Sequence, residues 1–366
     1  MSRGENRIDK LFAHMEEREI DVSLIVFPIH VYYFTGFLYN PHERLLALVA
    51  DRRSREAKLL VPALDREAAL AHWPERQTVA IRDTEDPLAL LNREIGGGVR
   101  TIGLEKGRVT VRLYESLRGA FPDASFVDLD PWMTSVRLKK SESEMEQVRR
   151  AVEAVERVMA VAVQKIKPGM TESELAAELE YEARRLGPIR PAFDFTVLTG
   201  KRSAFPHMQS GPYAIQPRDF VVVDIGVNVG GYCSDITRTF VAGECTKEQE
   251  RMYQAVLEAN RRAVELASAG IPLGRLDQAA REVIDAWGYG KYFTHRLGHG
   301  LGLEIHEPPS VHGENGSPVE PGMLFTIEPG IYIPSIGGVR IEDDVYIRED
   351  GSVEVVTRFS RELQCI

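Results

Sequence analysis

The pattern of hydrophobic and polar positions changes character at about residue 135. Before that point, short apolar runs alternate with stretches whose apolar residues recur every three or four positions. The first pattern is typical of buried strands and the second of amphipathic helices. Strands are predicted at residues 22–27, 45–50, 58–61, 78–81, 101–104 and 125–129, and helices at 8–17, 64–72, 86–94 and 109–120. Residues 32–37 are predicted to close in a turn. Strands that alternate with helices indicate a small α/β domain.

After residue 135 the elements become longer. Residues 131–140 form the predicted joint, and a capping box of Ser141 and Glu144 predicts a long helix to about residue 165. A second box, Thr171 with Glu174, predicts a helix to about residue 186. Strands and glycine turns follow from residue 195, with two further helices predicted at 246–268 and 273–288. The pattern therefore predicts two domains, residues 1–135 and residues 136–366.

The second domain contains a faint internal repeat. The segment around Gly169 parallels the segment around Gly270, an offset of 270 − 169 = 101 residues. Two carboxylates at strand ends, Asp224 and Glu328, differ by 328 − 224 = 104 residues. A helix pair followed by strands thus occurs twice at a similar period, which indicates a duplicated half-domain. Two halves related by a pseudo-twofold axis would place the acids of one half opposite those of the other.

Composition narrows the class of function. Hydrophobic residues make up 43% and charged residues 27% of the 366 residues, as in ordinary globular proteins. A net charge of −10 argues against nucleic acid as a partner, because nucleic-acid binding needs a basic surface. The polar residues 1–7 do not resemble a signal peptide, and no apolar run approaches the ~20 residues that span a bilayer. Three cysteines cannot build a disulfide framework, so we expect a cytoplasmic protein without a membrane partner.

Candidate chemistry lies in acids at the ends of apolar runs. They are Asp224, Asp235, Glu328 and Glu342, and His299 stands between two glycines. An unpaired carboxylate is expensive to bury, and metal ions would remove that cost. Four carboxylates carry a charge of −4, which two divalent cations balance. The oxygen-rich set favours Mn²⁺, with Co²⁺, Fe²⁺ or Zn²⁺ as alternatives. Two such ions roughly 3.5–4 Å apart share a water molecule and lower its pKa, so the set predicts metal-assisted hydrolysis.

These five residues, in their order and surroundings, resemble the metal ligands of the pita-bread metallopeptidases. That family includes proline dipeptidase, aminopeptidase P and methionine aminopeptidase. The resemblance covers residues 141–366, and residues 1–135, with Tyr33-Phe34-Thr35-Gly36-Phe37, resemble the creatinase-type N-terminal domain of the Xaa-Pro branch. It implies an α+β, pita-bread catalytic domain with a pseudo-twofold duplicated half, preceded by a smaller α/β domain. It also implies a homodimer that cleaves small peptides.

The resemblance implies roles for further residues. His207 and His306 would contact the scissile carbonyl and the developing oxyanion, and His295 would contact substrate. Glu328 would double as the general base. Arg340, two residues before Glu342, would orient the ligand carboxylates or contact substrate. Gly337 and Gly338 would let the backbone approach the ring of a substrate proline.

One departure from the family bears on the substrate. Dipeptidase members use a basic residue, usually an arginine between the metal-binding histidine and the first ligand glutamate, to hold the substrate carboxylate. Residues 300–327 contain no arginine or lysine and offer His312 instead. Either Arg340 holds the carboxylate, or the enzyme is aminopeptidase P-like and takes longer peptides. The same fold also allows hydrolysis of a non-peptide amide or a non-catalytic role in peptide binding.

Overall fold

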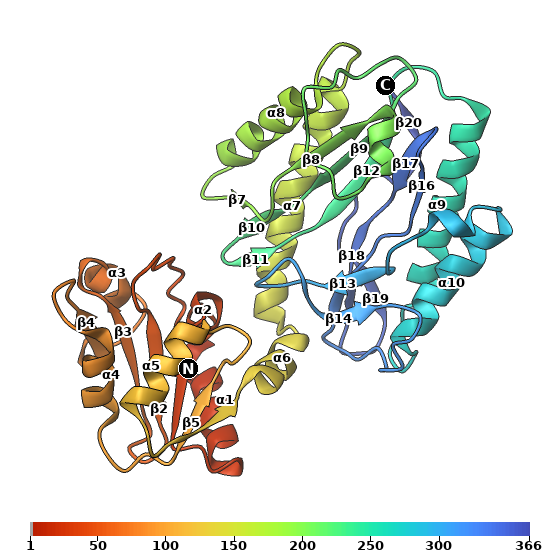
Figure 1. Ribbon diagram of the computed structural model, residues 1–366. Helices are drawn as coiled ribbons and strands as arrows, with labels where there is room; N and C mark the ends of the chain where they lie inside the picture. Colours follow the sequence, from red (N-terminus) through yellow and green to blue (C-terminus); the bar gives the residue numbers. More distant parts are fainter. Residues whose placement is uncertain (1–2) are drawn as a thin grey trace. The chain divides into compact units, whose positions relative to one another are not determined.

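The computed structural model describes residues 3–366, so Met1 and Ser2 of the polar start lie outside the described residues. The chain forms two compact units, Met1–Val136 and Arg137–Ile366. Their elements are coloured along the chain in Figure 1. The predicted fold class, a smaller α/β unit before an α+β unit, is confirmed.

A six-stranded sheet forms the centre of the first unit, in the order β4-β3-β2-β1-β5-β6. The strands are β1 (Val22–Ile25), β2 (Ala47–Asp51), β3 (Glu56–Pro62), β4 (Thr78–Ile81), β5 (Thr101–Leu104) and β6 (Ser125–Asp128). The helices are α1 (Arg3–Glu17), α2 (Pro28–Thr35), α3 (Arg66–Leu70), α4 (Pro87–Ile95), α5 (Val111–Ala120) and α6 (Asp130–Leu138). Every residue of β1 is buried, because both faces of the sheet are covered.

One prediction for this unit was wrong. Residues 28–35 form helix α2, where a turn was predicted at 32–37. Most of α2 is buried, so it has no polar face to reveal a helical period; it begins with Pro28 and ends at Gly36, whose φ of 77° is left-handed. The boundary between the two units, after Val136, falls within the predicted joint at 131–140, most of which forms helix α6.

The first half of the second unit packs two helices against strands. The helices are α7 (Glu142–Lys165) and α8 (Glu172–Arg185), and both predicted capping boxes are confirmed. The strands are β7 (Arg190–Pro191), β8 (Thr196–Thr199), β9 (Phe220–Ile225), β10 (Val227–Val229), β11 (Tyr232–Cys233) and β12 (Ile236–Val241). Strands β8, β9 and β12 are antiparallel neighbours, and the last strand of the chain, β20 (Gln364–Cys365), adds to β12 in parallel. One apolar core joins α7 and α8 to this sheet.

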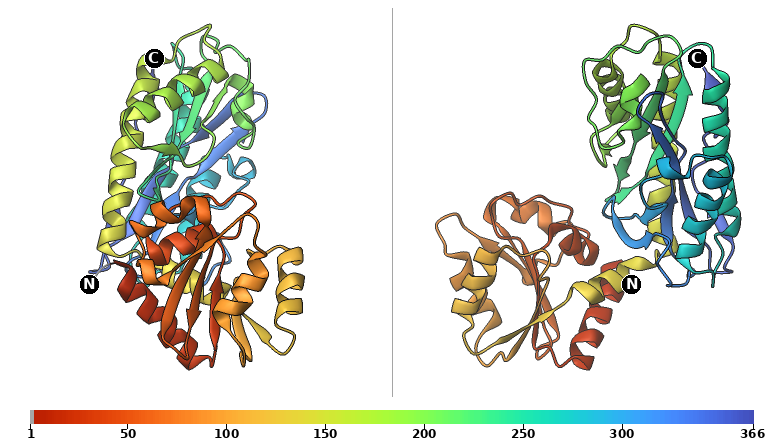
Figure 2. Two further views of the ribbon diagram at one scale, coloured as in Figure 1. Left: turned by 90° about the vertical axis from the view of Figure 1, so that its left-hand side faces the viewer. Right: turned by 45° about the vertical axis from the view of Figure 1, so that its right-hand side comes forward.

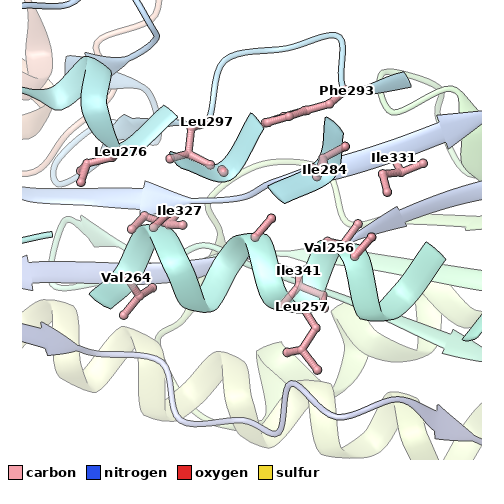
Figure 3. Packing of buried hydrophobic residues seen from close by; sticks show 14 of the residues in the cluster. Val256, Leu257, Val264, Leu276, Ile284, Phe293, Leu297, Ile327, Ile331 and Ile341 are labelled. Atoms are coloured by element: carbon pink, nitrogen blue, oxygen red, sulfur yellow. The ribbon is translucent and has the colours of Figure 1, made fainter. Parts of the chain in front are cut away.

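The second half repeats this arrangement. Its helices are α9 (Lys247–Leu266) and α10 (Leu273–Ala286), and its five-stranded sheet has the order β14-β13-β15-β18-β19. The strands of this sheet are β13 (Gly298–Gly300), β14 (Glu307–Val311), β15 (Leu324–Ile327), β18 (Asp343–Ile347) and β19 (Val353–Val355). Strands β16 (Gly330–Ile333) and β17 (Gly337–Arg340) form a separate two-stranded sheet. Figure 3 shows side chains of α9 and α10, such as Val256 and Ile284, near Ile327 and Ile331 of the strands.

The backbone shows the duplication directly. The Gly169 N–H donates to the carbonyl of Ile215, and the Gly270 N–H donates to the carbonyl of Val319, each at 2.9 Å. The donors differ by 270 − 169 = 101 residues and the acceptors by 319 − 215 = 104 residues. Both glycines have a φ of 89°. Strands β8, β9 and β12 thus correspond to β13, β15 and β18, and Figure 2 shows the two helix pairs of this unit from two further directions.

Two further sequence features have simple counterparts. No helix among residues 3–366 is long and apolar enough to cross a membrane. The three cysteines are free thiols, and Cys233 is buried. Burial raises the pKa of Cys233 to about 12, which makes it an inert apolar side chain.

Candidate active site

A cavity of about 280 Å³ in the second unit is lined by nine residues predicted to bind metal, act in catalysis or contact substrate. They are Asp224, Asp235, His299, Glu328 and Glu342 together with His207, His295, His306 and Arg340. They come from positions up to 342 − 207 = 135 residues apart. The fold therefore brings these nine residues to one place.

Corresponding strand ends in the two halves position the four acids. Asp224 lies in β9 opposite Thr237 of β12, and Asp235 directly precedes β12. In the other half, Glu328 directly follows β15 and Glu342 directly precedes β18. Side chains two residues apart on a strand share a face, so Asp235 lies on the same side as Thr237 and Asp224. Each half thus contributes two acids to the cavity.

His299 faces the acids through its Nε2 atom. This atom lies 3.4 Å from Glu328 Oε1 and 3.7 Å from Asp235 Oδ2. Its Nδ1 atom lies 3.1 Å from the carbonyl oxygen of Gly300, which accepts the Nδ1 hydrogen. The ring therefore keeps a lone pair on Nε2, the form that binds a metal ion. Burial lowers the pKa of His299 to about 3, so the ring is neutral at physiological pH.

The four acids lie close together, and the positive charges and hydrogen bonds around them do not offset their mutual repulsion and burial. Burial, followed by repulsion from Glu342 and Asp224, raises the pKa of Asp235 well above its ordinary value. Burial and the charges of Glu328 and Asp224 do the same for Glu342. Burial raises the pKa of Glu328 to about 7. Oδ1 of Asp224 is buried and has no hydrogen-bond partner among the described residues. Uncompensated carboxylates around a neutral imidazole are a donor set that fits divalent cations.

Ligand atoms of Asp235, His299 and Glu342 lie within 4.8 Å of one another, so these three residues alone form a group able to hold a metal ion. Asp235 also has a buried neighbour that the sequence analysis did not select. Asp344 Oδ2 accepts a hydrogen bond from the backbone N–H of Asp235 at 3.1 Å. This contact fixes the backbone from which the Asp235 carboxylate projects.

Arg340 is buried behind the acids and bonded to three groups. Its guanidinium donates to Asp224 Oδ2 at 2.5 Å, to Thr237 Oγ1 at 3.0 Å and to Tyr332 Oη at 3.1 Å. Thr237 in turn donates to Glu342 Oε2 at 2.7 Å. Of the two roles considered for Arg340, the contacts favour orientation of the acids over contact with substrate.

Two of the three threonines that flank the acids bond to them. Thr237 bonds Glu342, and Thr326 donates to Glu328 Oε1 at 3.2 Å while accepting the backbone N–H of His299 at 3.1 Å. Thr239 instead exchanges hydrogen bonds with the backbone of Arg340. Thr239 therefore aligns strand β17 rather than an acid.

The remaining histidines differ in their surroundings. His306 and His207 are exposed on the cavity wall, and the ring of His306 lies 4.3 Å from that of His299. Burial and then the charge of Arg296 lower the pKa of His306. His295 has both ring nitrogens engaged, Nδ1 with the Arg296 carbonyl oxygen and Nε2 with Tyr332 Oη at 3.0 Å. His295 is thus joined through Tyr332 to Arg340 and the acids.

The sequence matches two protein-family models. Residues 146–349 match metallopeptidase family M24, and residues 7–139 match the Creatinase/Prolidase N-terminal domain. The chain belongs to metallopeptidase family M24. The predicted membership in the pita-bread metallopeptidases is confirmed, and the M24 protein described here is a metallopeptidase.

Relatives of this M24 metallopeptidase match along its whole length. An uncharacterized peptidase from Staphylococcus aureus (strain MW2) is 38% identical over 355 residues, 97% of this chain and 99% of that protein. The prolidase from Pyrococcus furiosus is 36% identical with a TM-score of 0.86, covering 95% of this chain and 99% of that one. The Xaa-Pro dipeptidase from Bacillus anthracis is 32% identical with a TM-score of 0.90, covering 99% and 100%. The X-Pro aminopeptidase from Thermotoga maritima MSB8 is 34% identical with a TM-score of 0.89, covering 98% and 100%.

Sequence reasoning missed part of the M24 cavity wall. Phe193, Pro206 and Ile305 supply its apolar surface, and Arg296 a second arginine. Pro206 and Ile305 each directly precede a predicted substrate histidine, which was a usable signal.

The role predicted for Gly337 and Gly338 was wrong. Neither lines the cavity; a Cβ at Gly337 would lie 2.8 Å from the carbonyl oxygen of Gly200, and the Gly338 N–H donates to Ser203 Oγ. These glycines let β17 approach the segment 200–204, not a substrate ring.

Proposed function

We propose that this metallopeptidase hydrolyses the Xaa-Pro bond of dipeptides or short peptides with two divalent cations. The observation that carries the proposal is the convergence of four carboxylates and the Nε2 atom of His299 on one small cavity. The proposed ligands are Asp224, Asp235, His299, Glu328 and Glu342.

The donor set supports the number and kind of ions. Four ionised carboxylates carry −4 and two divalent cations +4, with Arg340 supplying a further positive charge behind Asp224. Carboxylate oxygens with one imidazole favour Mn²⁺ over softer ions, and Co²⁺, Fe²⁺ and Zn²⁺ are the alternatives. When bound, such a pair supplies Lewis acidity and an activated water molecule.

The side chains of the chain have separate tasks in this reaction. Glu328 would accept the proton of the attacking water and pass it to the leaving nitrogen. His207 and His306, on the cavity wall, donate hydrogen bonds to the carbonyl oxygen as it gains negative charge. His295 contacts the substrate from the same wall. Arg340 orients Asp224 through its buried hydrogen bond.

Two observations support proline as the leaving residue. The cavity wall contains Phe193, Pro206 and Ile305, an apolar surface suited to a pyrrolidine ring, which has no N–H to be satisfied. Similar solved structures include proteins named prolidase, Xaa-Pro dipeptidase and X-Pro aminopeptidase. A volume of about 280 Å³ is at the small end of ligand pockets, roughly 300–1,000 Å³, which favours a short substrate.

An aminopeptidase P-like reaction on longer peptides is the second candidate. The absence of arginine and lysine from residues 300–327 favours this candidate, because the segment that usually binds the substrate carboxylate in the family then has no cationic side chain. Hydrolysis of a non-peptide amide is the third and is disfavoured by the apolar wall.

The test compares Ala-Pro, Ala-Pro-Ala and Ala-Ala as substrates of the Mn²⁺-loaded protein, with Asp235→Asn as control. We expect cleavage of Ala-Pro, no cleavage of Ala-Ala and loss of activity in the variant without loss of fold. Cleavage of Ala-Pro-Ala at a comparable rate would select the second candidate. Inactivity on both proline substrates would overturn the proposal.

The proposal also covers oligomeric state, cellular location and domain organisation. We propose a homodimer in the cytoplasm, testable by light scattering and by fractionation of the source cells. We also propose that residues 1–135 and 136–366 act as separate domains. Expression of residues 136–366 alone, followed by measurement of cooperative unfolding, tests this division.

A further inference from the structure

Two of the three cysteines lie at the same end of one sheet. Cys365 is in β20, directly opposite Val241 of β12 in the parallel pair. Cys245 lies four residues beyond Val241 (245 − 241 = 4), after the backbone turns through Gly243, whose φ of 83° is left-handed. Figure 1 shows the C-terminus at this end of the sheet. The two cysteines are 365 − 245 = 120 residues apart in the sequence, and the fold places them on neighbouring segments.

Backbone hydrogen bonds hold these two segments together. The Gly243 N–H donates to the carbonyl oxygen of Ile366 at 2.5 Å, and the Ile366 N–H donates to the carbonyl of Val241 at 2.8 Å. Leu363 and Cys245 also pack against the same apolar cluster, which includes the buried residues of α9. The strand that contains Cys365 and the turn that leads to Cys245 therefore form one hydrogen-bonded unit.

The two thiols interact directly in this unit. Burial, followed by the charge of Cys365 and a hydrogen bond between the two side chains, raises the pKa of Cys245 to about 12. Cys365 is exposed and Cys245 is half-buried, whereas Cys233 is buried in β11. A small oxidant in solution therefore reaches Cys365 first, and Cys245 is the neighbouring thiol that can react with the oxidised product.

We propose that Cys245 and Cys365 are a redox pair, which a hydroperoxide joins in a reversible disulfide that fastens β20 to the end of β12. The inference is independent of the proposed peptidase activity. It concerns a bond that forms under oxidation, because both thiols are free in the folded protein. Disulfides of proteins in reducing compartments are usually transient bonds of this redox-sensing kind.

The reaction needs one molecule of hydroperoxide and no group beyond the two thiols. The Cys365 thiolate attacks an oxygen of hydrogen peroxide, the O–O bond breaks, and water leaves while Cys365 becomes a sulfenic acid. The Cys245 sulfur then attacks the Cys365 sulfur. The S–S bond forms as the S–O bond breaks, and the hydroxyl takes the thiol proton of Cys245 and leaves as a second water. The two thiols lose two electrons and the peroxide gains them; a small dithiol reverses the bond by exchange.

The bond has a consequence for stability. It closes a loop that contains the whole second half of the unit, including His299, Glu328 and Glu342. A cross-link over such a long loop restricts the unfolded chain, and here it also ties down a strand of only two residues. We expect the oxidised protein to unfold at a Tm higher by roughly 5–15 °C than the reduced protein.

The experiment treats the dilute full-length protein with hydrogen peroxide, blocks the remaining thiols and digests it with trypsin without a reductant. Each cysteine falls in its own tryptic peptide, Cys245 in 239–247, Cys365 in 362–366 and Cys233 in 219–238. We expect the free thiols to fall from three to one and the peptides 239–247 and 362–366 to appear as one linked species, two hydrogens lighter than their sum. Dithiothreitol should separate them and return the Tm to that of the reduced protein.

Three variants make the test specific. Cys245→Ser and Cys365→Ser should each abolish the linked species and the rise in Tm. Cys233→Ala, the matched control, removes a thiol outside the pair and should retain both. Cys365 is exposed, so its substitution by serine leaves the fold of the reduced protein unchanged and any loss reports on the bond itself.

The opposite results are equally distinct. Oxidation of Cys365 to a sulfinic acid without the linked species, or a cross-link between two copies of the chain through Cys365, would overturn the redox pair. A linked species that forms while the Tm stays unchanged would overturn the fastening of β20. Activity on Ala-Pro is not part of the test, so failure of the proposed peptidase function leaves these outcomes as they stand.

Discussion

Glu328→Gln in the metal-free protein offers a direct measure of the crowding of the acids. Gln has nearly the same shape as Glu, and its carbonyl oxygen can still accept the hydrogen bond from Thr326. The substitution removes only the negative charge. Burial raises the pKa of Glu328 from 4.5 to about 7, so the folded protein binds this proton more tightly than the unfolded chain does. The free energy of unfolding therefore falls as pH rises from 4.5 through 7.

The shift of about 2.5 pKa units corresponds to roughly 3 kcal/mol, at 1.36 kcal/mol per unit. Above pH 7 the wild type bears nearly this whole cost, whereas Glu328→Gln bears none; below pH 4.5 the two are nearly equal. The variant should therefore be more stable than wild type by about 3 kcal/mol at pH 8 and by less than about 0.5 kcal/mol at pH 4.5. For a domain of this size the pH 8 difference corresponds to roughly 6–12 °C in Tm.

The assay is thermal unfolding after treatment with a chelator, at half-unit steps from pH 4.5 to 8. Glu265→Gln, an exposed change on α9, is the matched control and should show a constant difference from wild type. Excess Mn²⁺ should reverse the order, because wild type gains binding free energy that the variant loses in part. A Glu328→Gln difference that stays flat with pH in the metal-free protein would refute the reasoning that this carboxylate is held against repulsion.

Three further predictions concern the supports of the site. Arg340→Lys should lower kcat about 10- to 100-fold with a smaller change in KM, because a lysine cannot reach all three groups that Arg340 bonds. An unchanged kcat in steady-state assays would contradict the orienting role of Arg340. Gly298→Ala would place a Cβ 1.9 Å from a β15 carbonyl oxygen, so urea unfolding should show a loss of about 1–3 kcal/mol and metal titration a weaker affinity. Gly316→Ala, at an open position, is its control, and equal effects of the two would count against the close approach. Asp277→Ala should lower the free energy of unfolding, measured by chemical denaturation, by about 2–4 kcal/mol. The buried Asp277 carboxylate accepts a hydrogen bond from the backbone N–H of Leu297, just before β13, and pairs with Arg281. A loss below about 0.5 kcal/mol would show that water replaces these bonds.

The sequence located the acids of the site because each had a local signal. Asp224 and Glu328 follow apolar runs and stand at strand ends, where a carboxylate must find a partner. The helices α7 and α8 were placed nearly to the residue because Ser141 and Thr171 begin capping boxes. Signals of this kind are read within a few residues, so they survive without knowledge of the tertiary structure.

What the sequence left open depends on contacts between distant residues. Arg340 was given two possible roles, and its bond to Asp224, 116 residues earlier, favours one of them. Gly338 was assigned to substrate because its partner Ser203, 135 residues earlier, gives no local sign. Helix α2 was missed because burial on nearly all sides removes the polar face that marks a helix. Arg296 was passed over because an exposed arginine is usually only a surface residue.

Strand β20 has a consequence for the order in which the protein is made. It completes the sheet of the first half from residues 364–365, pairing with Phe240 and Val241 of β12, and the Ile366 N–H bonds the carbonyl of Val241 at 2.8 Å. On the ribosome, β12 therefore emerges with an open edge that stays unpaired while more than a hundred further residues are added. The first half supplies only Asp224 and Asp235 of the proposed ligands, so the ligand set is incomplete until the second half has been added. We expect the nascent first half to bind no metal.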